Sequence, residues 1–107
     1  MIKHITDQEI EQIINNNEKL ILVFGKGTNC SVCHAVENRV NTDLLAKFAN
    51  LDVYYINIDE NPLFRGKHLV FSVPALMLFD SNREILRESR IINFTQLEKV
   101  LNLYFNN

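Results

Sequence analysis

Residues 20–34 read LILVFGKGTNCSVCH, and this stretch gives the strongest indication of the fold. Its first five residues, Leu20 to Phe24, are an unbroken apolar run rich in strand formers, which suits a strand covered on both faces of a sheet. A short loop with two glycines then leads to Cys30 and Cys33, which are separated by two residues. We therefore expect a pair of thiols shortly after a central strand.

The residues that follow the thiol pair indicate a helix. Four apolar residues recur every four positions, namely Val36, Val40, Leu44 and Phe48. This period is typical of a long amphipathic helix, so Cys33 should lie in its first turn. In open α/β sheets, ligand sites form at the carboxyl ends of strands, where such helices begin.

The Cys30-x-x-Cys33-His34 motif also fits two other kinds of site. It matches the attachment site of a c-type haem, but a haem protein needs an axial ligand and a helix-rich shell, and this chain predicts many strands. A structural zinc ion needs four ligands, so His4, His34 or His68 would have to join the cysteines. Cys33 and His34 are adjacent, which makes them awkward partners for one tetrahedral ion. We expect neither a metal nor a cofactor.

The composition is that of an ordinary globular protein, with 107 residues of which 47% are hydrophobic and 22% charged. This length corresponds to a single domain over residues 1–107. The net charge is -2, and acidic and basic residues are interspersed along the sequence. The sequence therefore has no basic stripe that would bind nucleic acid. The N-terminus lacks the apolar core of a signal peptide, and no apolar run reaches membrane-spanning length. We expect a cytoplasmic protein without a membrane partner, in which a lone close cysteine pair is more often catalytic or metal-binding than structural.

The N-terminal region predicts an edge strand followed by a helix. The strand covers Ile2 to Ile5, and Thr6 and Glu9 then have the spacing of a capping box, so the helix should begin near Asp7. Three asparagines at positions 15–17 end it. Its buried face should consist of Ile10, Ile13 and Ile14.

The second half of the chain begins with another strand and a short helix. Val53 to Ile58 is a covered strand, and Asn61 and Pro62 provide the N-cap and the first-turn proline of the helix. Val73 to Phe79 and Glu84 to Ser89 are strands joined by a short turn, which indicates an antiparallel hairpin.

Asn93 and Gln96 open the last helix by the same capping logic. The residues that should face the core from this helix are Leu97, Val100, Leu101 and Tyr104. The complete order is β-α-β-α-β-α-β-β-α, which requires a central mixed sheet flanked by helices on both faces. The fold class is therefore α/β.

In this order and spacing the chain resembles the thioredoxin superfamily over nearly its whole length. The matching features are LILVF, Cys30-x-x-Cys33, the sequence INIDENP from Ile56 to Pro62, and VPALMLF from Val73 to Phe79. The dithiol motif alone is weak, but a Val-Pro pair that opens a strand about forty residues later makes the match specific. The resemblance implies the thioredoxin fold and a thiol-disulfide oxidoreductase.

The two cysteines should have different roles. Cys30 should be the nucleophile, because unpaired N–H groups and the positive end of the helix dipole stabilise a thiolate there. Cys33 is then the resolving thiol. The resemblance further implies that Pro74 is cis and packs against the dithiol, and that the main chain of Val73 binds the substrate. His34, one turn after Cys30, is a candidate for tuning the thiolate, although we expect it on the solvated helix surface.

Several positions depart from the family pattern. Asn29 replaces the tryptophan before the first cysteine, and Ser31 and Val32 replace a Gly-Pro pair. The family's buried carboxylate, which takes a proton from the resolving thiol, corresponds to Phe24, and its buried lysine corresponds to Tyr55. The proton relay and recognition by a standard thioredoxin reductase therefore do not carry over.

The function predicted from these features is the exchange of thiols and disulfides through Cys30 and Cys33. The expected substrates are disulfide-containing proteins or small thiols, and the expected electron donor is a reductase or a low-molecular-weight thiol. The alternative is a thioredoxin-fold adaptor whose dithiol is weak or dispensable, because fold alone does not guarantee activity. The substrate, the donor and the direction of electron flow stay open at this stage.

Overall fold

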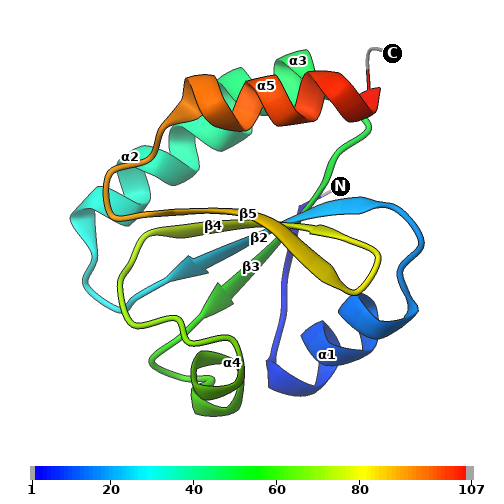
Figure 1. Ribbon diagram of the computed structural model, residues 1–107. Helices are drawn as coiled ribbons and strands as arrows, with labels where there is room; N and C mark the ends of the chain where they lie inside the picture. Colours follow the sequence, from blue (N-terminus) through cyan, green and yellow to red (C-terminus); the bar gives the residue numbers. More distant parts are fainter. Residues whose placement is uncertain (1, 106–107) are drawn as a thin grey trace.

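The computed structural model describes residues 2–105, and its centre is a five-stranded sheet in the order β1-β3-β2-β4-β5 (Figure 1). The strands are β1 Ile2–His4, β2 Leu20–Lys26, β3 Asp52–Asn57, β4 Ala75–Asp80 and β5 Arg83–Ser89. β1, β3 and β2 run parallel, and the pairs β2–β4 and β4–β5 are antiparallel. The sheet is therefore mixed, with β2 at its centre as predicted. β4 begins at Ala75 and not at Val73.

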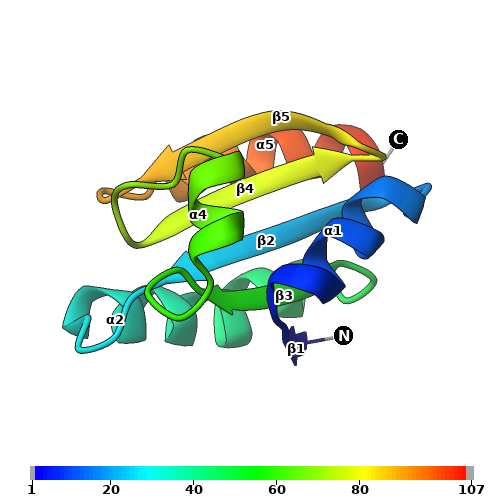
Figure 2. The same cartoon turned by 90° about the horizontal axis from the view of Figure 1, so that it is seen from below.

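Helices cover both faces of this sheet (Figure 1 and Figure 2). The helical segments are α1 Asp7–Asn16, α2 Ser31–Arg39, a π-helical turn Val40–Leu44, α3 Leu45–Lys47, α4 Pro62–Lys67 and α5 Phe94–Phe105. α1 and α4 lie on one face, and α2, α3 and α5 on the other. This arrangement confirms the predicted α/β class. Within residues 2–105, no helix is long and apolar enough to cross a bilayer.

The long helix after the cysteines differs from the regular α-helix expected there. Its middle is a π-helical turn, in which the N–H of Leu45 donates to the carbonyl of Val40. The Thr42 hydroxyl also donates to the Asn38 carbonyl at 2.8 Å, a side-chain bond that competes with the regular backbone pattern. The predicted apolar face is retained, because Val40 is buried together with the residues one and two turns later.

The alternation of β2 divides the core into two layers. Leu22 and Phe24 point to the face of α2 and α5, where they share a buried cluster with Cys33. Ile21 and Val23 point to the face of α1 and α4, where the second buried cluster lies. The dithiol helix therefore rests on the layer that contains Phe24.

The starts of α1 and α4 are tied together across the chain. The Asn61 Oδ1 accepts the N–H of Asp7 at 2.9 Å. In return, the Asp7 carboxylate accepts the N–H groups of Phe64 at 2.8 Å and Leu63 at 3.3 Å. Asn61 is the N-cap residue of α4 and Pro62 lies in its first turn, as predicted, but the Asn61 side chain makes no capping bond to its own helix and instead bonds Asp7 and the Asn57 carbonyl. The cap of α4 comes from Asp7.

The core face of α5 is narrower than predicted. Leu97 and Leu101 are buried and Val100 is partly buried, as expected. Tyr104 does not face the core, because 45% of its surface is exposed and its hydroxyl donates to Asp80 Oδ2 at 2.9 Å. A tyrosine near the end of the helix can satisfy its hydroxyl there without entering the apolar layer.

Candidate dithiol site

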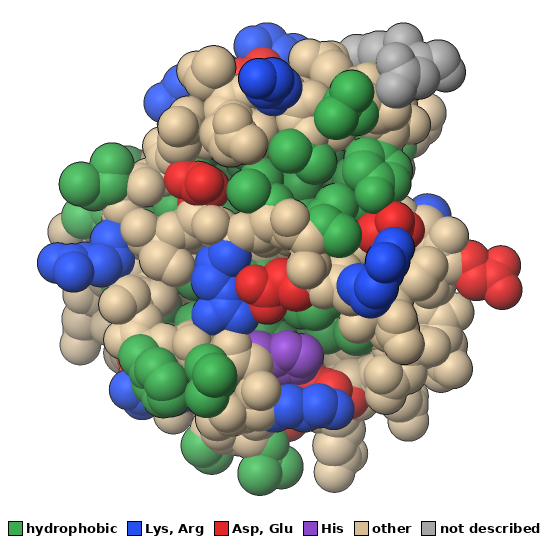
Figure 3. All heavy atoms as spheres, viewed as in Figure 1, with side chains coloured by type: hydrophobic (Ala, Val, Ile, Leu, Met, Phe, Trp, Pro, Cys, Tyr) green, Lys and Arg blue, Asp and Glu red, His purple; other side chains and the backbone are tan. Residues whose placement is uncertain are grey.

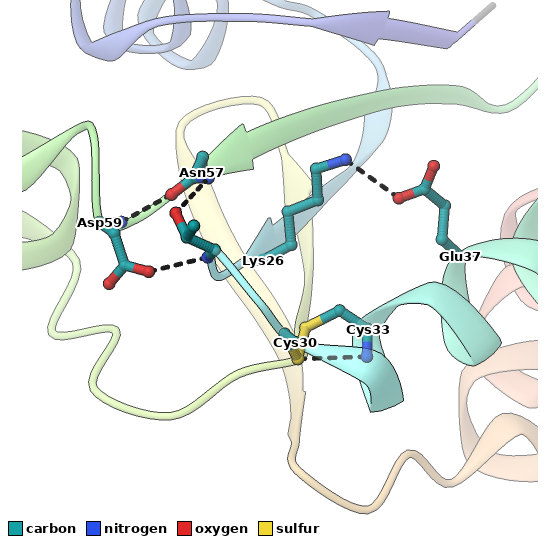
Figure 4. Close-up of a disulfide and its surroundings, with 7 residues drawn as sticks. Lys26, Cys30, Cys33, Glu37, Asn57 and Asp59 are labelled. Atoms are coloured by element: carbon teal, nitrogen blue, oxygen red, sulfur yellow. Dashed lines mark hydrogen bonds and ion pairs between the residues drawn. A yellow bond between two sulfur atoms is a disulfide. The ribbon is translucent and has the colours of Figure 1, made fainter.

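Cys30 and Cys33 are joined by a disulfide at the start of α2, with their Cα atoms 5.2 Å apart (Figure 4). Cys30 is the N-cap residue and is partly exposed, whereas Cys33 lies in the first turn and is only 2% exposed. The two predicted sulfurs therefore meet, and they differ in their access to solvent.

The backbone of α2 presents a hydrogen-bond donor to the outer sulfur. The N–H of Cys33 donates to Cys30 Sγ at 3.2 Å (Figure 4). The first turn of α2 contains no acidic residue that would oppose the positive end of the helix dipole. In the reduced protein, we expect this environment to favour a thiolate on Cys30.

The loop before Cys30 is attached to the connection between β3 and α4. The N–H of Thr28 donates to Asp59 Oδ2 at 2.8 Å, and Asn57 Nδ2 donates to Thr28 Oγ1 at 3.2 Å (Figure 4). Asn29 has a φ of 57°, in the left-handed region that asparagine adopts more readily than most residues. Sequence reasoning missed Asn57 and Asp59 as supports of the site. Their position just beyond the carboxyl end of a strand was the available signal.

Gly27 allows three parts of the site to approach one another. A Cβ atom at this position would lie 3.2 Å from Val73 Cγ2, 3.3 Å from Asp59 Oδ2 and 3.9 Å from Cys30 Cβ. Any larger residue would push against the Val73 side chain or the Asp59 carboxylate. The loop thus brings Val73 close to the outer cysteine.

The Val73–Pro74 peptide bond is cis, as the sequence predicts. Pro74 is buried, and the partly buried Val73 packs against both core clusters. The carbonyl of Pro74 accepts the N–H of Arg90 at 2.8 Å, which ties this segment to the loop before α5. The role of the Val73 main chain in substrate binding stays a prediction.

The three histidines lie at separate places. His34 is exposed on α2, on the solvated surface that we expected for it. His4 stacks on Tyr55 with ring centroids 5.2 Å apart, and His68 Nε2 lies 2.6 Å from Glu11 Oε1. Among residues 2–105, no group of three His, Cys, Asp or Glu side chains is arranged to hold a metal ion.

The layer beneath the disulfide is apolar. Phe24, at the position of the family's carboxylate, is fully buried in the same cluster as Cys33, and its ring centroid lies 5.0 Å from that of Tyr55. The Tyr55 hydroxyl donates to Asn41 Oδ1 at 2.6 Å. Burial and, to a lesser extent, the Glu37 carboxylate raise the pKa of Tyr55 far above its ordinary value, so it is a neutral phenol.

An ion pair joins the end of β2 to α2 near this layer. Lys26 Nζ lies 3.1 Å from Glu37 Oε1, and the two side chains are 22% and 23% exposed (Figure 4). Glu37 follows Cys33 by one helical turn, and Lys26 Nζ lies 5.5 Å from the centre of the Tyr55 ring. The pair holds α2 to the strand that leads into the dithiol.

Comparisons with known proteins agree with this geometry. The family model described as Thioredoxin matches residues 1–102, so the chain belongs to the thioredoxin family. It is 37% identical over 92 residues to the thioredoxin-like protein YdfQ of Bacillus subtilis (strain 168), a match that covers 86% of this chain and 80% of that protein. It is 27% identical over 105 residues to a thioredoxin of Porphyra purpurea, with 98% of each chain covered.

Solved structures show the same fold. Fasciola hepatica thioredoxin superposes with a TM-score of 0.81 at 23% identity and covers 97% of this chain and 99% of its own. A mutant thioredoxin of Halobacterium salinarum NRC-1 gives a TM-score of 0.78 at 21% identity, with 96% and 89% covered. The predicted thioredoxin fold is confirmed. Proteins of this family are typically thiol-disulfide oxidoreductases, and the chain has the family's Cys-x-x-Cys pair.

Proposed function

We propose that this protein is a cytoplasmic thiol-disulfide oxidoreductase, in which Cys30 attacks a substrate disulfide and Cys33 resolves the mixed disulfide. The observation that carries the proposal is the unequal exposure of the two sulfurs. Cys30 is partly exposed at the N-terminus of α2, whereas Cys33 is 2% exposed and lies beneath it. A substrate sulfur can therefore reach Cys30 but not Cys33.

The reaction proceeds in two exchanges. The Cys30 thiolate attacks one sulfur of the substrate disulfide, forms a mixed disulfide and releases the other substrate sulfur as a thiolate. Cys33 then loses its proton and attacks Cys30 Sγ, which restores the Cys30–Cys33 disulfide and releases the second substrate thiolate. Two electrons pass from the dithiol to the substrate, and the released thiolates take up protons from water.

The remaining parts of the site support the binding of a disulfide. The partly buried Val73 lies near Cys30, and we expect its main-chain groups to pair with an extended substrate segment. A reductase or a low-molecular-weight thiol returns the two electrons to the oxidised pair. Phe24 places a buried ring where the family has a carboxylate to take the proton of Cys33, so we expect this step to be slow at neutral pH.

Reduction of insulin with dithiothreitol as the donor tests the proposal. We expect the wild type to accelerate it, and we expect Cys33→Ser to accumulate a stable mixed disulfide that Cys30→Ser does not form. The matched Cys30→Ser variant controls for nonspecific capture. A wild type that fails to accelerate the reaction, or two variants that capture substrates equally, would instead favour the adaptor with a dispensable dithiol.

A further inference from the structure

The loop between α4 and β4 exposes two large apolar side chains just before the Val73–Pro74 segment. Leu69 is 64% exposed and Phe71 is 65% exposed. Figure 3 shows apolar side chains standing out at its lower left, in the region that α4 and the following loop occupy in Figure 1. Neither side chain contributes to the two buried clusters. Their exposure therefore calls for an explanation outside the core.

The backbone of Leu69 makes this exposure more unusual. Its φ is 55°, in the left-handed region, where a leucine is uncommon and strained. Asparagine or glycine would adopt this conformation at lower cost. Leucine here thus gains neither burial nor a favourable conformation, which points to a role for the exposed side chain itself.

An arginine on β5 holds the strained segment in place. Arg87 donates to the carbonyl of Leu69 at 3.0 Å and to the carbonyl of His68 at 2.6 Å. The same guanidinium makes two bonds of 2.7 Å to the Glu84 carboxylate, which fixes its orientation. These bonds restrain the loop, and a restrained loop loses less entropy when a partner binds.

The loop that carries these two side chains leads directly into the Val73–Pro74 segment of the site. Phe71 precedes Val73 by two residues, so their Cα atoms are at most about 7 Å apart. Val73 in turn lies near Cys30. A Cβ atom placed on Gly27 would be 3.2 Å from Val73 Cγ2 and 3.9 Å from Cys30 Cβ. A substrate polypeptide that is bound at Cys30 and Val73 needs only a few further residues to reach Leu69.

We propose that Leu69 and Phe71 form a specificity surface for polypeptide disulfides, which binds an apolar side chain a few residues from the reactive cysteine of the substrate. This inference rests on the proposed function, because it assumes that Cys30 attacks a disulfide. A small polar disulfide held only at Cys30 lacks both the reach and the apolar groups to use this surface. The surface therefore selects proteins over small disulfides.

Two substrates and two variants test the surface. The double variant Leu69→Asn/Phe71→Ser removes both apolar groups, and asparagine suits the left-handed backbone. The control is Leu103→Asn, which removes a leucine of similar exposure, 61%, at the far end of α5. Insulin reports on a polypeptide disulfide and 5,5′-dithiobis(2-nitrobenzoic acid) on a small one.

The double variant should lose about tenfold in kcat/KM for insulin, mainly through KM, which corresponds to about 1.4 kcal/mol. Its rate with the small disulfide should stay within about twofold of the wild type, and the control should match the wild type with both substrates. Equal losses on both substrates, or no loss on insulin, would overturn the specificity surface while the proposed function stands. A wild type inactive on both substrates would overturn the proposed function and the surface with it.

Discussion

The first backbone N–H groups of α2 and α4 have no acceptor within their own helix, and the two helix starts supply different acceptors for them. At α2 the acceptor is a sulfur of the same turn, Cys30 Sγ, which takes the N–H of Cys33. At α4 the acceptor is the carboxylate of Asp7, more than fifty residues away in the chain, which takes the N–H groups of Leu63 and Phe64. One feature of helix physics thus serves two different purposes.

The difference lies in when the acceptor is charged. The Asp7 carboxylate accepts from α4 whatever the redox state of the dithiol, so its bonds stabilise the fold continuously. Cys30 is an anion only when the disulfide is reduced and the thiol has ionised. At α2, the helix terminus therefore favours the reactive state of a side chain. Substitutions at the start of α2 should therefore change the rate of thiol chemistry, whereas substitutions at the start of α4 should change the stability of the fold.

The largest effect should come from Cys30→Ser. A serine hydroxyl still accepts the N–H of Cys33 but does not ionise at neutral pH, so insulin reduction should fall at least about 1000-fold. The melting temperature should stay within about 2 °C of that of the reduced wild type. Turnover assays and thermal melts in excess dithiothreitol measure both quantities. Residual turnover above a tenth of the wild type would show that Cys30 is not the nucleophile.

The opposite result is expected for Asp7→Ala. Loss of the cap should lower the free energy of unfolding by about 2 kcal/mol, because a partly buried N–H of α4 loses its acceptor. The rate of dithiol attack on a small disulfide should change less than twofold at 25 °C. Urea unfolding measures the stability, with Glu18→Ala as an exposed acidic control. A parallel fall in rate in the fully folded variant would contradict the separation.

A smaller, pH-dependent effect is expected where Glu11 joins α1 to α4. Its carboxylate lies 2.6 Å from both Lys67 Nζ and His68 Nε2. Partial burial raises the pKa of Glu11, but hydrogen bonds from Lys67 and His68 outweigh it and hold the pKa below its ordinary value. A carboxylate with a depressed pKa stabilises the fold above its unfolded-state pKa, near 4.3, and loses this contribution as the pH falls through the folded-state pKa.

Glu11→Gln should therefore be less stable than the wild type by about 0.5–1 kcal/mol at pH 6, and the difference should shrink towards pH 3. Urea unfolding at pH 6, 4.5 and 3 gives the comparison. The rate of thiol–disulfide exchange at the Cys30–Cys33 site should be the same in Glu11→Gln and in the wild type. A difference that stays constant down to pH 3 would show that the Glu11 charge contributes nothing.

The smallest effect is expected at the start of α1, where the cap is local and exposed. The N–H of Thr6 donates to Glu9 Oε1 at 3.2 Å. Glu9→Gln retains an acceptor at this position, so its melting temperature should change by no more than about 1 °C. Thermal melts of Glu9→Gln and Asp7→Ala under the same conditions compare the two losses in melting temperature. A loss as large as that of Asp7→Ala would mean that burial does not decide the strength of these caps.

The capping residues also show which parts of the structure could be predicted from sequence. The Thr6–Glu9 pair is three residues apart, so the spacing alone predicts their bond, which the structure contains. Asn93 likewise accepts the N–H of Gln96 at 3.0 Å. Asn61 has an equally good local pattern, yet its side chain bonds Asp7 from α1. Local spacing predicts that a helix begins, but it does not identify a competing partner from elsewhere in the chain.

The same limit applies to the site. The Cys-x-x-Cys spacing placed Cys30 and Cys33 correctly, because two intervening residues in a helical first turn bring their sulfurs together. Asp59, which holds the loop at Thr28, has no local pattern that would assign it to the site. Arg87 on β5 similarly clamps the loop after α4 through bonds that span nearly twenty residues.

Hydrophobic period and residue spacing were enough to predict the order of the strands and helices, the central position of β2 and the placement of the dithiol at a helix start. These signals act over a few neighbouring residues, so they can be read along the chain. Three other features appear only in the folded protein: Asp7 caps α4, Tyr104 turns outward to Asp80, and Leu69 is held exposed in a strained conformation. They depend on which polar groups and side chains meet across the fold, and that pairing exists only once the sheet has brought distant segments together.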